Sequence, residues 1–435
     1  MKRYIAIMLA LLMVGTTAGC SRAKDFFPES TAMGEHGQTE AIDEEGLKIG
    51  YLLPSGTDAT NTISRVEGIR KMQVETGLKD AQILIKRGVK DKDCANVIDE
   101  LVENKCNIIF ACSGSYENAV VQAAEKYPDV QFCQEGGKKA KKSGLTNMHN
   151  YYVRLYEAYY TAGVTAGLKL NQMLNSGKVS SGDCTIGFVA NKKTPESTSC
   201  INAFYLGVGK VCSQADMLVR YVGSTGVYDD DGEAAKQLAE AGAAFMCQYT
   251  ATTAVAAVCA ENDIPIIGND VNVIDVAPSE ALTSAKADWS IYYSYAVKNV
   301  IKGKAIATDW TGDYKDGSVI LTQLNDQHLA SGTVEKLKEV EKNLRSGKEK
   351  IFDTENFTVD GDSLEECIEE DTDFKQYKKN VKNGEYKESM KRSAPSMNFL
   401  IDGIEESTYD YLEEDTDDAD DTENNTEDNG EDEEE

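Results

Sequence analysis

The sequence predicts an α/β protein with two doubly wound lobes, each a mostly parallel sheet with helices on both faces. Three observations support this fold class. The chain has 435 residues, of which 41% are hydrophobic, a size and composition that suit two domains. Short apolar segments bounded by turns alternate with segments of helical periodicity. This alternation occurs twice, first over residues 47–152 and then over residues 153–287.

The first series predicts four strands, and each is an apolar run that ends in a turn. A helix with apolar residues at helical spacing follows each of the first three strands. Right-handed crossovers would make this first lobe a Rossmann-like sheet, to which residues 288–325 are expected to return. The predicted strands are 47–53, 81–88, 106–113 and 130–136, and the predicted helices are 62–77, 94–105 and 119–127.

The second series opens on a predicted helix near residues 154–174 and then repeats the same alternation. It predicts a second doubly wound lobe over residues 153–287, with a ligand cleft between the two lobes. The predicted strands are 184–190, 217–224, 243–250 and 264–270, and the predicted helices are 201–212, 233–242 and 253–262.

The N-terminal residues are typical of an export signal. Lys2 and Arg3 precede the short apolar run 4–15, and Thr17-Ala18-Gly19 leads into Cys20. The run is too short for a transmembrane helix, which needs about 20 apolar residues. The segment resembles a bacterial lipobox, which implies cleavage of a signal peptide, residues 1–19, and lipidation of Cys20. An ordinary signal peptide with a chance cysteine remains the alternative.

Residues 20–46 are polar and lack periodicity, so they are expected to form a tether between the bilayer and the folded lobes. This arrangement places the protein on the extracytoplasmic face of the plasma membrane, with the lipid bilayer as a partner.

The C-terminal part differs in composition from the two lobes. Residues 326–401 form an extension that begins with a charged helix and has no assigned function. Residues 402–435 contain 19 Asp and Glu and no Lys or Arg, so most of the net charge of −29 lies there. Such a segment is expected to be a disordered acidic tail. A chain this acidic, without a basic stripe, is not expected to bind nucleic acid.

Nothing in the sequence predicts an enzyme, a cofactor or a metal site. The chain has only three histidines and contains no HExxH, GxSxG or P-loop motif. None of the 11 cysteines is spaced as CxxC, so a zinc ribbon is not expected. Ligand binding with hinge closure is the simpler use of this scaffold.

Several segments resemble the basic membrane protein (BMP) family of solute-binding lipoproteins, in order, from Leu47 to Asn325. They include HNYYVRLYEAYYTAGVTAGLK, CINAFYLGVGKV, IPIIGNDVN and LTSAKADWSIYY. The resemblance implies a type I periplasmic-binding-protein fold. It also implies capture of a purine nucleoside or a related small molecule and its delivery to the permease of an ABC transporter.

The resemblance and the strand-end rule together select candidate ligand residues in the first lobe. Asp58 matches a family aspartate after the first strand, but Asn61 stands where the family has an aromatic ring. After the third strand lie Ser113, Tyr116 and Asn118, where Asn118 replaces a family aspartate. The alternative for this turn is a helix N-cap.

In the second lobe the candidates are Tyr228, Gln248 and Asp270, and Trp289 follows that lobe in the sequence. The resemblance implies that Asp270 accepts hydrogen bonds from ribose hydroxyls. Capping of the next turn is the alternative for Asp270, and core packing near a hinge is the alternative for Trp289. The substituted aromatic position leaves two other functions open: a sensor for a membrane signalling receptor, or a surface adhesin or structural lipoprotein that has lost its ligand.

Overall fold

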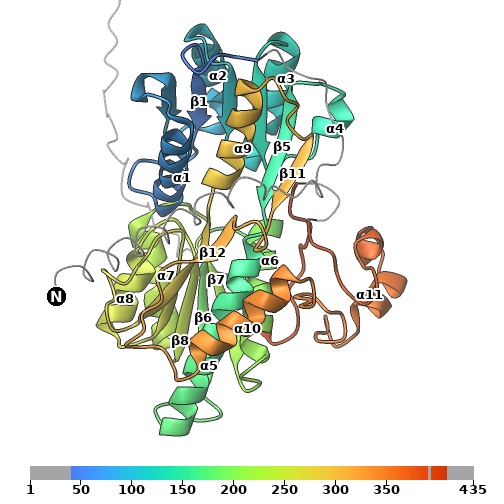
Figure 1. The fold of residues 1–435 in the computed structure, drawn as a ribbon. Coiled ribbons are helices and arrows are strands. Elements are labelled where there is room, and N and C mark those ends of the chain that lie inside the picture. Colours follow the sequence, from blue (N-terminus) through green and yellow to red (C-terminus); the bar gives the residue numbers. More distant parts are fainter. Residues whose placement is uncertain (1–40, 390–392, 409–435) are drawn as a thin grey trace, which may run out of the picture.

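The computed structural model describes residues 41–389 and 393–408, and these form two lobes connected by several crossings of the chain (Figure 1). The predicted pair of doubly wound lobes is confirmed. Cys20 and the predicted signal peptide and tether, up to residue 40, lie outside the described residues, as do residues 409–435 of the predicted tail.

The first lobe contains a six-stranded parallel sheet in the order β11-β5-β4-β3-β1-β2. Helices α1 and α9 pack together on one face of the sheet, and α2 and α3 lie together on the other. The strands are β1 (Ile49–Leu52), β2 (Ile83–Lys86), β3 (Ile108–Ala111), β4 (Gln131–Glu135), β5 (Met148–Val153) and β11 (Asp309–Gly312). The helices are α1 (Thr60–Thr76), α2 (Cys94–Glu103), α3 (Glu117–Lys126), α4 (Ala140–Ser143) and α9 (Ser290–Ile301), with short 3₁₀ helices at Asp80–Gln82, Asp91–Asp93 and Gly114–Tyr116.

The second lobe contains a seven-stranded sheet in the order β12-β10-β9-β8-β6-β7-β13, which is parallel except for β12. Helices α5 and α6 cover one face and α7 and α8 the other, while α10 packs on α5. The strands are β6 (Thr185–Ala190), β7 (Asp216–Tyr221), β8 (Phe245–Tyr249), β9 (Ile266–Asn269), β10 (Ala281–Ala287), β12 (Val319–Leu321) and β13 (Ile404–Thr408). The helices are α5 (Tyr156–Ser176), α6 (Pro195–Gly209), α7 (Tyr228–Glu240), α8 (Ala254–Glu261) and α10 (Thr333–Arg345).

Burial explains why β1 and β3 are continuous apolar runs in the sequence. Every residue of β1, β3, β4 and β5 is buried, whereas edge strand β2 is half-buried throughout. Helices on both faces exclude water from the inner strands, so both faces of each strand favour apolar residues. The same pattern fixes which strand ends meet at the boundary between the lobes.

The chain crosses between the lobes after β5, after β10 and after β11. The segment 288–325, predicted to return to the first lobe, is therefore divided between the two sheets. Its helix α9 and strand β11 belong to the first lobe, whereas β12 pairs antiparallel with β10 in the second. An apolar run in the sequence predicts a strand, but it does not indicate which of the two sheets the strand joins.

The C-terminal extension lies against the second lobe and contains α11 (Leu364–Glu370) and a 3₁₀ helix at Phe374–Lys379 (Figure 1). It ends in β13, which pairs in parallel with β7 along the sheet edge. The prediction of a disordered tail from residue 402 is therefore wrong for residues 404–408. Strand pairing uses backbone groups, and Glu406 forms an ion pair with Lys193, so the acidic composition does not prevent this strand.

Helices α5 and α6 approach each other closely because glycines face each other across the contact. A Cβ atom on Gly163 would lie 2.1 Å from the carbonyl oxygen of Phe204, and one on Gly207 would lie 2.1 Å from the carbonyl oxygen of Tyr160. The close approach fixes the start of α5, which follows directly from the first lobe, against α6.

Gly163→Ala is therefore expected to lower the free energy of unfolding by about 2 kcal/mol, in the range of other overpacked cores. Urea unfolding followed by circular dichroism measures this change. Gly209→Ala is the matched control, because a Cβ atom there meets nothing within 4 Å. Equal stability of the two variants would contradict the proposed tight contact.

Candidate functional site

The two lobes touch where the carboxyl ends of their central strands approach each other. The backbone N–H of Thr60 donates a hydrogen bond to the carbonyl oxygen of Ala251 at 2.9 Å, which joins the lobes directly. Lys286 on β10 also forms an ion pair with Glu67 on α1. Ligands of open α/β sheets bind beyond the carboxyl ends of the strands, so this boundary is the candidate site. This interlobe site consists of residues from both lobes. The first lobe contributes Thr60, Ser64, Arg65, Glu135 and Trp289, and the second contributes Glu196, Gln248, Asp270 and Lys286.

Asp270 follows β9 directly and is held by a chain of hydrogen bonds. Its φ angle of 64° lies in the left-handed region, which aspartate tolerates better than most residues. Its Oδ2 accepts from Asn269 Nδ2 at 3.0 Å, and the hydroxyl of Tyr159 donates to Asn269 Oδ1 at 3.0 Å. The carboxylate is thus oriented at the lobe boundary while only 7% of the residue is exposed.

The surroundings of Asp270 change its acidity. Burial raises the pKa of this carboxyl to about 6, while the charges of Arg65 and Lys286 oppose the rise and Glu135 adds to it. At pH 7 the group is still mostly ionised, so it offers hydrogen-bond acceptors only.

Arg65 and Glu135 form a buried ion pair on the first-lobe side of the site. Arg65 NH2 lies 2.6 Å from Glu135 Oε1, and Arg65 Nε donates to Glu135 Oε2 at 3.2 Å. Both residues are at most 9% exposed. Sequence reasoning missed the pair, because Arg65 looked like one more polar residue of an amphipathic helix. Applying the strand-end rule to the predicted strand 130–136 would have found Glu135.

Trp289 lies at the start of α9, where its ring contacts the guanidinium group of Arg65. The Cζ of Arg65 lies 4.9 Å from the centroid of the indole ring, within the range of a cation–π contact. The predicted tryptophan therefore does lie at the boundary, although only 6% of it is exposed.

Glu196, near the N-terminus of α6, adds a further carboxylate that sequence reasoning missed. Its pKa is raised to about 7, mainly by burial and then by the neighbouring charge of Glu135, while Arg65 and the hydroxyl of Tyr249 oppose the rise. Glu135, Glu196 and Asp270 therefore all interact with the positive charge of Arg65, while Lys286 acts on Asp270.

Several buried polar atoms of the interlobe site have no hydrogen-bonding partner among the described residues. They are the hydroxyls of Thr60 and Ser64, the indole N–H of Trp289 and Oε1 of Gln248. An unsatisfied buried polar group costs about 1–3 kcal/mol, so a polar ligand at this boundary would recover part of that cost. The amide of Gln248 is held in place, since its Nε2 donates to the carbonyl oxygen of Thr252 at 2.9 Å.

The structure does not bring the other first-lobe candidates into the interlobe site. Tyr116 is 1% exposed and lies in the core beside α2, with its hydroxyl donating to the carbonyl oxygen of Val89. Asn118 is exposed on α3 and accepts a hydrogen bond from Lys139.

Asp58 and Ser113 lie in turns at the carboxyl ends of strands, as predicted. Asp58 is exposed in the turn before α1. Ser113 is half-buried and caps a 3₁₀ helix, where its Oγ accepts from the backbone N–H of Ser115 at 3.4 Å. Their roles toward a ligand stay predictions.

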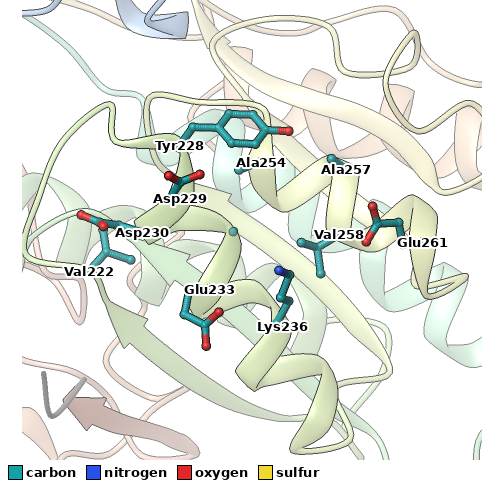
Figure 2. A pocket seen from close by; sticks show the side chains of 11 residues that line it. Val222, Tyr228, Asp229, Asp230, Glu233, Lys236, Ala254, Ala257, Val258 and Glu261 are labelled. Atoms are coloured by element: carbon teal, nitrogen blue, oxygen red, sulfur yellow. The ribbon is translucent and has the colours of Figure 1, made fainter. Parts of the chain in front are cut away.

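Tyr228 lies elsewhere, at the N-terminus of α7, where 52% of it is exposed. It lines a hollow of about 500 Å³ together with Asp229, Glu233, Lys236 and Glu261, and Figure 2 shows these side chains on and around α7 and α8. This hollow involves only the second lobe, so it cannot respond to the meeting of the two lobes as the interlobe site does.

The boundary also contains a buried thiol. Cys112, beside Arg65, has its pKa raised to about 11 by burial, so its thiol is protonated at neutral pH. No group of three or more His, Cys, Asp or Glu among the described residues is placed to hold a metal ion. Within the same residues, no helix combines the length and the apolarity needed to cross a membrane.

Comparison with known proteins places the chain among solute-binding proteins. Residues 53–351 match the Bmp family, described as ABC transporter substrate-binding protein PnrA-like. A purine-binding protein of Brucella abortus is 27% identical over 330 residues, which are 74% of this chain and 90% of that protein. A putative ABC transporter glucose-binding protein of Haloferax volcanii is 25% identical over 235 residues, which are 54% of this chain and 56% of that protein.

Solved structures agree on the fold. A solute-binding protein of an ABC transporter system from Aeropyrum pernix K1 has a TM-score of 0.59 at 15% identity and covers 74% of this chain and 97% of its own. One from Conexibacter woesei has a TM-score of 0.56 at 16% identity, over 70% of this chain and 98% of its own. The two lobes therefore have the predicted type I periplasmic-binding-protein fold, and the chain belongs to the Bmp family of PnrA-like ABC transporter substrate-binding proteins.

Proposed function

We propose that this protein captures a purine nucleoside, or a closely related compound, between its lobes and delivers it to the permease of an ABC importer. The observation that carries the proposal is the interlobe site, where an oriented carboxylate and several unsatisfied polar atoms from both lobes meet. Purine binding is what the name of the Brucella abortus relative states, and the same ligand class would use these groups.

Each half of a nucleoside has suitable partners at this boundary. Ribose hydroxyls are donors, and the two oxygens of Asp270 are acceptors held at fixed positions by Asn269. The base carries further donors and acceptors, which the free Oε1 of Gln248 and the indole N–H of Trp289 complement. Because carboxylates outnumber cations here, a neutral ligand is expected to bind better than a phosphorylated one.

Delivery to a permease fits the architecture, because closure of the lobes around a ligand changes the surface that a membrane partner meets. Lipidation of Cys20 would keep the protein at the extracytoplasmic face of the plasma membrane, beside such a permease. A multiply acylated N-terminus anchors stably, since each buried methylene contributes about 0.8 kcal/mol.

Nucleoside binding is tested by a thermal-shift screen of the protein with nucleosides, free bases, nucleotides and sugars. A ligand at 100 times its Kd adds about 2.7 kcal/mol of stability. Asp270→Asn is expected to weaken nucleoside binding by about ten-fold or more, because the amide removes a charged acceptor. Asp263→Asn is the matched control, since Asp263 also has a left-handed φ, 53°, but is exposed after α8.

A shift with sugars alone would replace the proposed ligand class but keep the binding role. A nucleoside shift that is equal in Asp270→Asn and in the wild type would remove Asp270 from the site. No shift with any compound would contradict the proposed ligand and favour a protein that has lost ligand binding.

Stability is expected to depend on pH through Glu196. Its pKa in the folded protein, about 7, lies above the ordinary value of 4.5, so the folded state binds more protons than the unfolded state between these values. The free energy of unfolding therefore falls as pH rises through this window. Glu196→Gln should lose this part of the pH dependence, measured by urea unfolding between pH 5 and pH 8.

The exposed Glu125 on α3 supplies the control variant, Glu125→Gln, which should keep the wild-type slope. A slope in Glu196→Gln that matches the wild type would show that Glu196 is not held in a buried, carboxylate-rich setting.

Membrane anchoring is tested by Cys20→Ser in the producing cell. The variant is expected to leave the membrane fraction and to lose incorporation of labelled fatty acid. Cys367→Ser is the control, because Cys367 is the one described cysteine that is not buried. Retention of label and of membrane association in Cys20→Ser would contradict lipidation.

A further inference from the structure

Hydrogen bonds from the N–H groups of Arg65 hold its planar guanidinium group in place. Its Nε and NH2 groups donate to the two oxygens of Glu135 at 3.2 and 2.6 Å, and NH1 donates to the carbonyl oxygen of Asn61 at 3.1 Å. These bonds use the rim of the guanidinium and fix its plane. Few of its donors are therefore left for an incoming anion.

The guanidinium group of Arg65 also contacts the aromatic ring of Trp289. The Cζ of Arg65 lies 4.9 Å from the centroid of Trp289, whose ring is in turn roughly parallel to that of Tyr293, with an interplanar angle of 20°. Arginine planes stack on aromatic rings and on nucleic-acid bases alike. The guanidinium carbon of Arg65 therefore lies over an indole ring that is itself nearly parallel to the ring of Tyr293.

Residues of the second lobe interact electrostatically with the guanidinium group of Arg65. The charge of Arg65 opposes the rise in pKa of Asp270, of Glu196 and of Tyr249, so all three groups lie within its electrostatic reach. Asp270 is the proposed acceptor for ribose hydroxyls. Arg65 is therefore the first-lobe cation whose charge acts on Asp270.

A purely structural role is a poor explanation for this arrangement. Removing two charges from water costs several kcal/mol per ion, and a buried ion pair often contributes no net stability compared with apolar residues of similar size. Residues 61 and 65 lie one turn apart on α1, so Arg65 occupies the helix turn next to the position where the family's aromatic ring is replaced by Asn61.

We propose that Arg65 is a specificity-determining residue whose guanidinium, backed by Trp289, stacks on the planar heteroaromatic base of the ligand in place of the ring absent at position 61. This inference rests on the proposed function and names the partner of the base. It also agrees with the expected preference for unphosphorylated ligands, because three of the five N–H donors of Arg65 already bond to Glu135 and Asn61.

The test compares Arg65→Lys with the wild type by isothermal titration calorimetry, using adenosine, guanosine and inosine as probes. Lysine keeps the charge but lacks the plane, so affinity should fall by about five-fold or more, as for the loss of one stacking partner. Arg70→Lys on the same helix is the matched control, because its side chain is 59% exposed, and it should bind as the wild type does.

A second readout follows the stack itself. The chain has two tryptophans, so Trp310→Phe leaves Trp289 as the single indole fluorophore. Nucleosides should change its emission when Arg65 is present and should change it less in Arg65→Lys. A group that only supports the fold would leave this ligand-dependent signal intact.

If Arg65→Lys fails to fold, the double variant Arg65→Gln with Glu135→Gln removes both charges together and leaves no unpaired buried ion. Weaker nucleoside binding with a retained circular dichroism spectrum supports the proposal. Wild-type affinity in either variant overturns it, even if Asp270→Asn weakens binding and the proposed function stands. A wild-type protein that binds no base-containing probe overturns both.

Discussion

The structure depends most on how charge is balanced where the two lobes meet. Glu135 of the first lobe and Glu196 and Asp270 of the second approach the guanidinium of Arg65, and Lys286 adds a further positive charge. Desolvation of these groups costs free energy, and their pairing offsets only part of that cost. The lobes therefore meet over a polar surface that is incomplete without a polar partner, rather than over an apolar interface that would close permanently.

The scaffold explains why these groups can meet at all. Each carboxylate is held near an end of an element, Glu135 on β4, Asp270 just beyond β9 and Glu196 at the start of α6. Glycines allow α5 and α6 to pack in close contact, and α5 begins directly after the chain leaves the first lobe. Rigid packing within each lobe thus leaves the crossings between lobes as the places where relative motion is expected.

Periodicity and turn signals were sufficient to predict β1 to β4 and β6 to β9, since these strands depend on local patterns of apolar residues, but they did not predict β5 or β11. The rule for strand ends also placed Gln248 and Asp270 at the lobe boundary, and the resemblance placed Trp289 there. Arg65, Glu135 and Glu196 were missed because a polar residue on a helix gives no local sign that it faces another lobe. Tyr116 lies in a core cluster, since an aromatic residue in a turn fits the core as well as a ligand site, and its role toward a ligand stays a prediction. Strand β13 was hidden by its acidic side chains, because its pairing depends on the backbone.

The proposed function depends on a ligand that binds between Arg65 and Asp270. A crystal structure of the lipid-free protein grown with adenosine tests this placement most directly. The ribose hydroxyls are expected within hydrogen-bonding distance of Asp270 and the base parallel to the guanidinium of Arg65, with the lobes closed around both. A nucleoside found only in the hollow between α7 and α8, or a lobe boundary unchanged and without ligand at saturating adenosine, would contradict it.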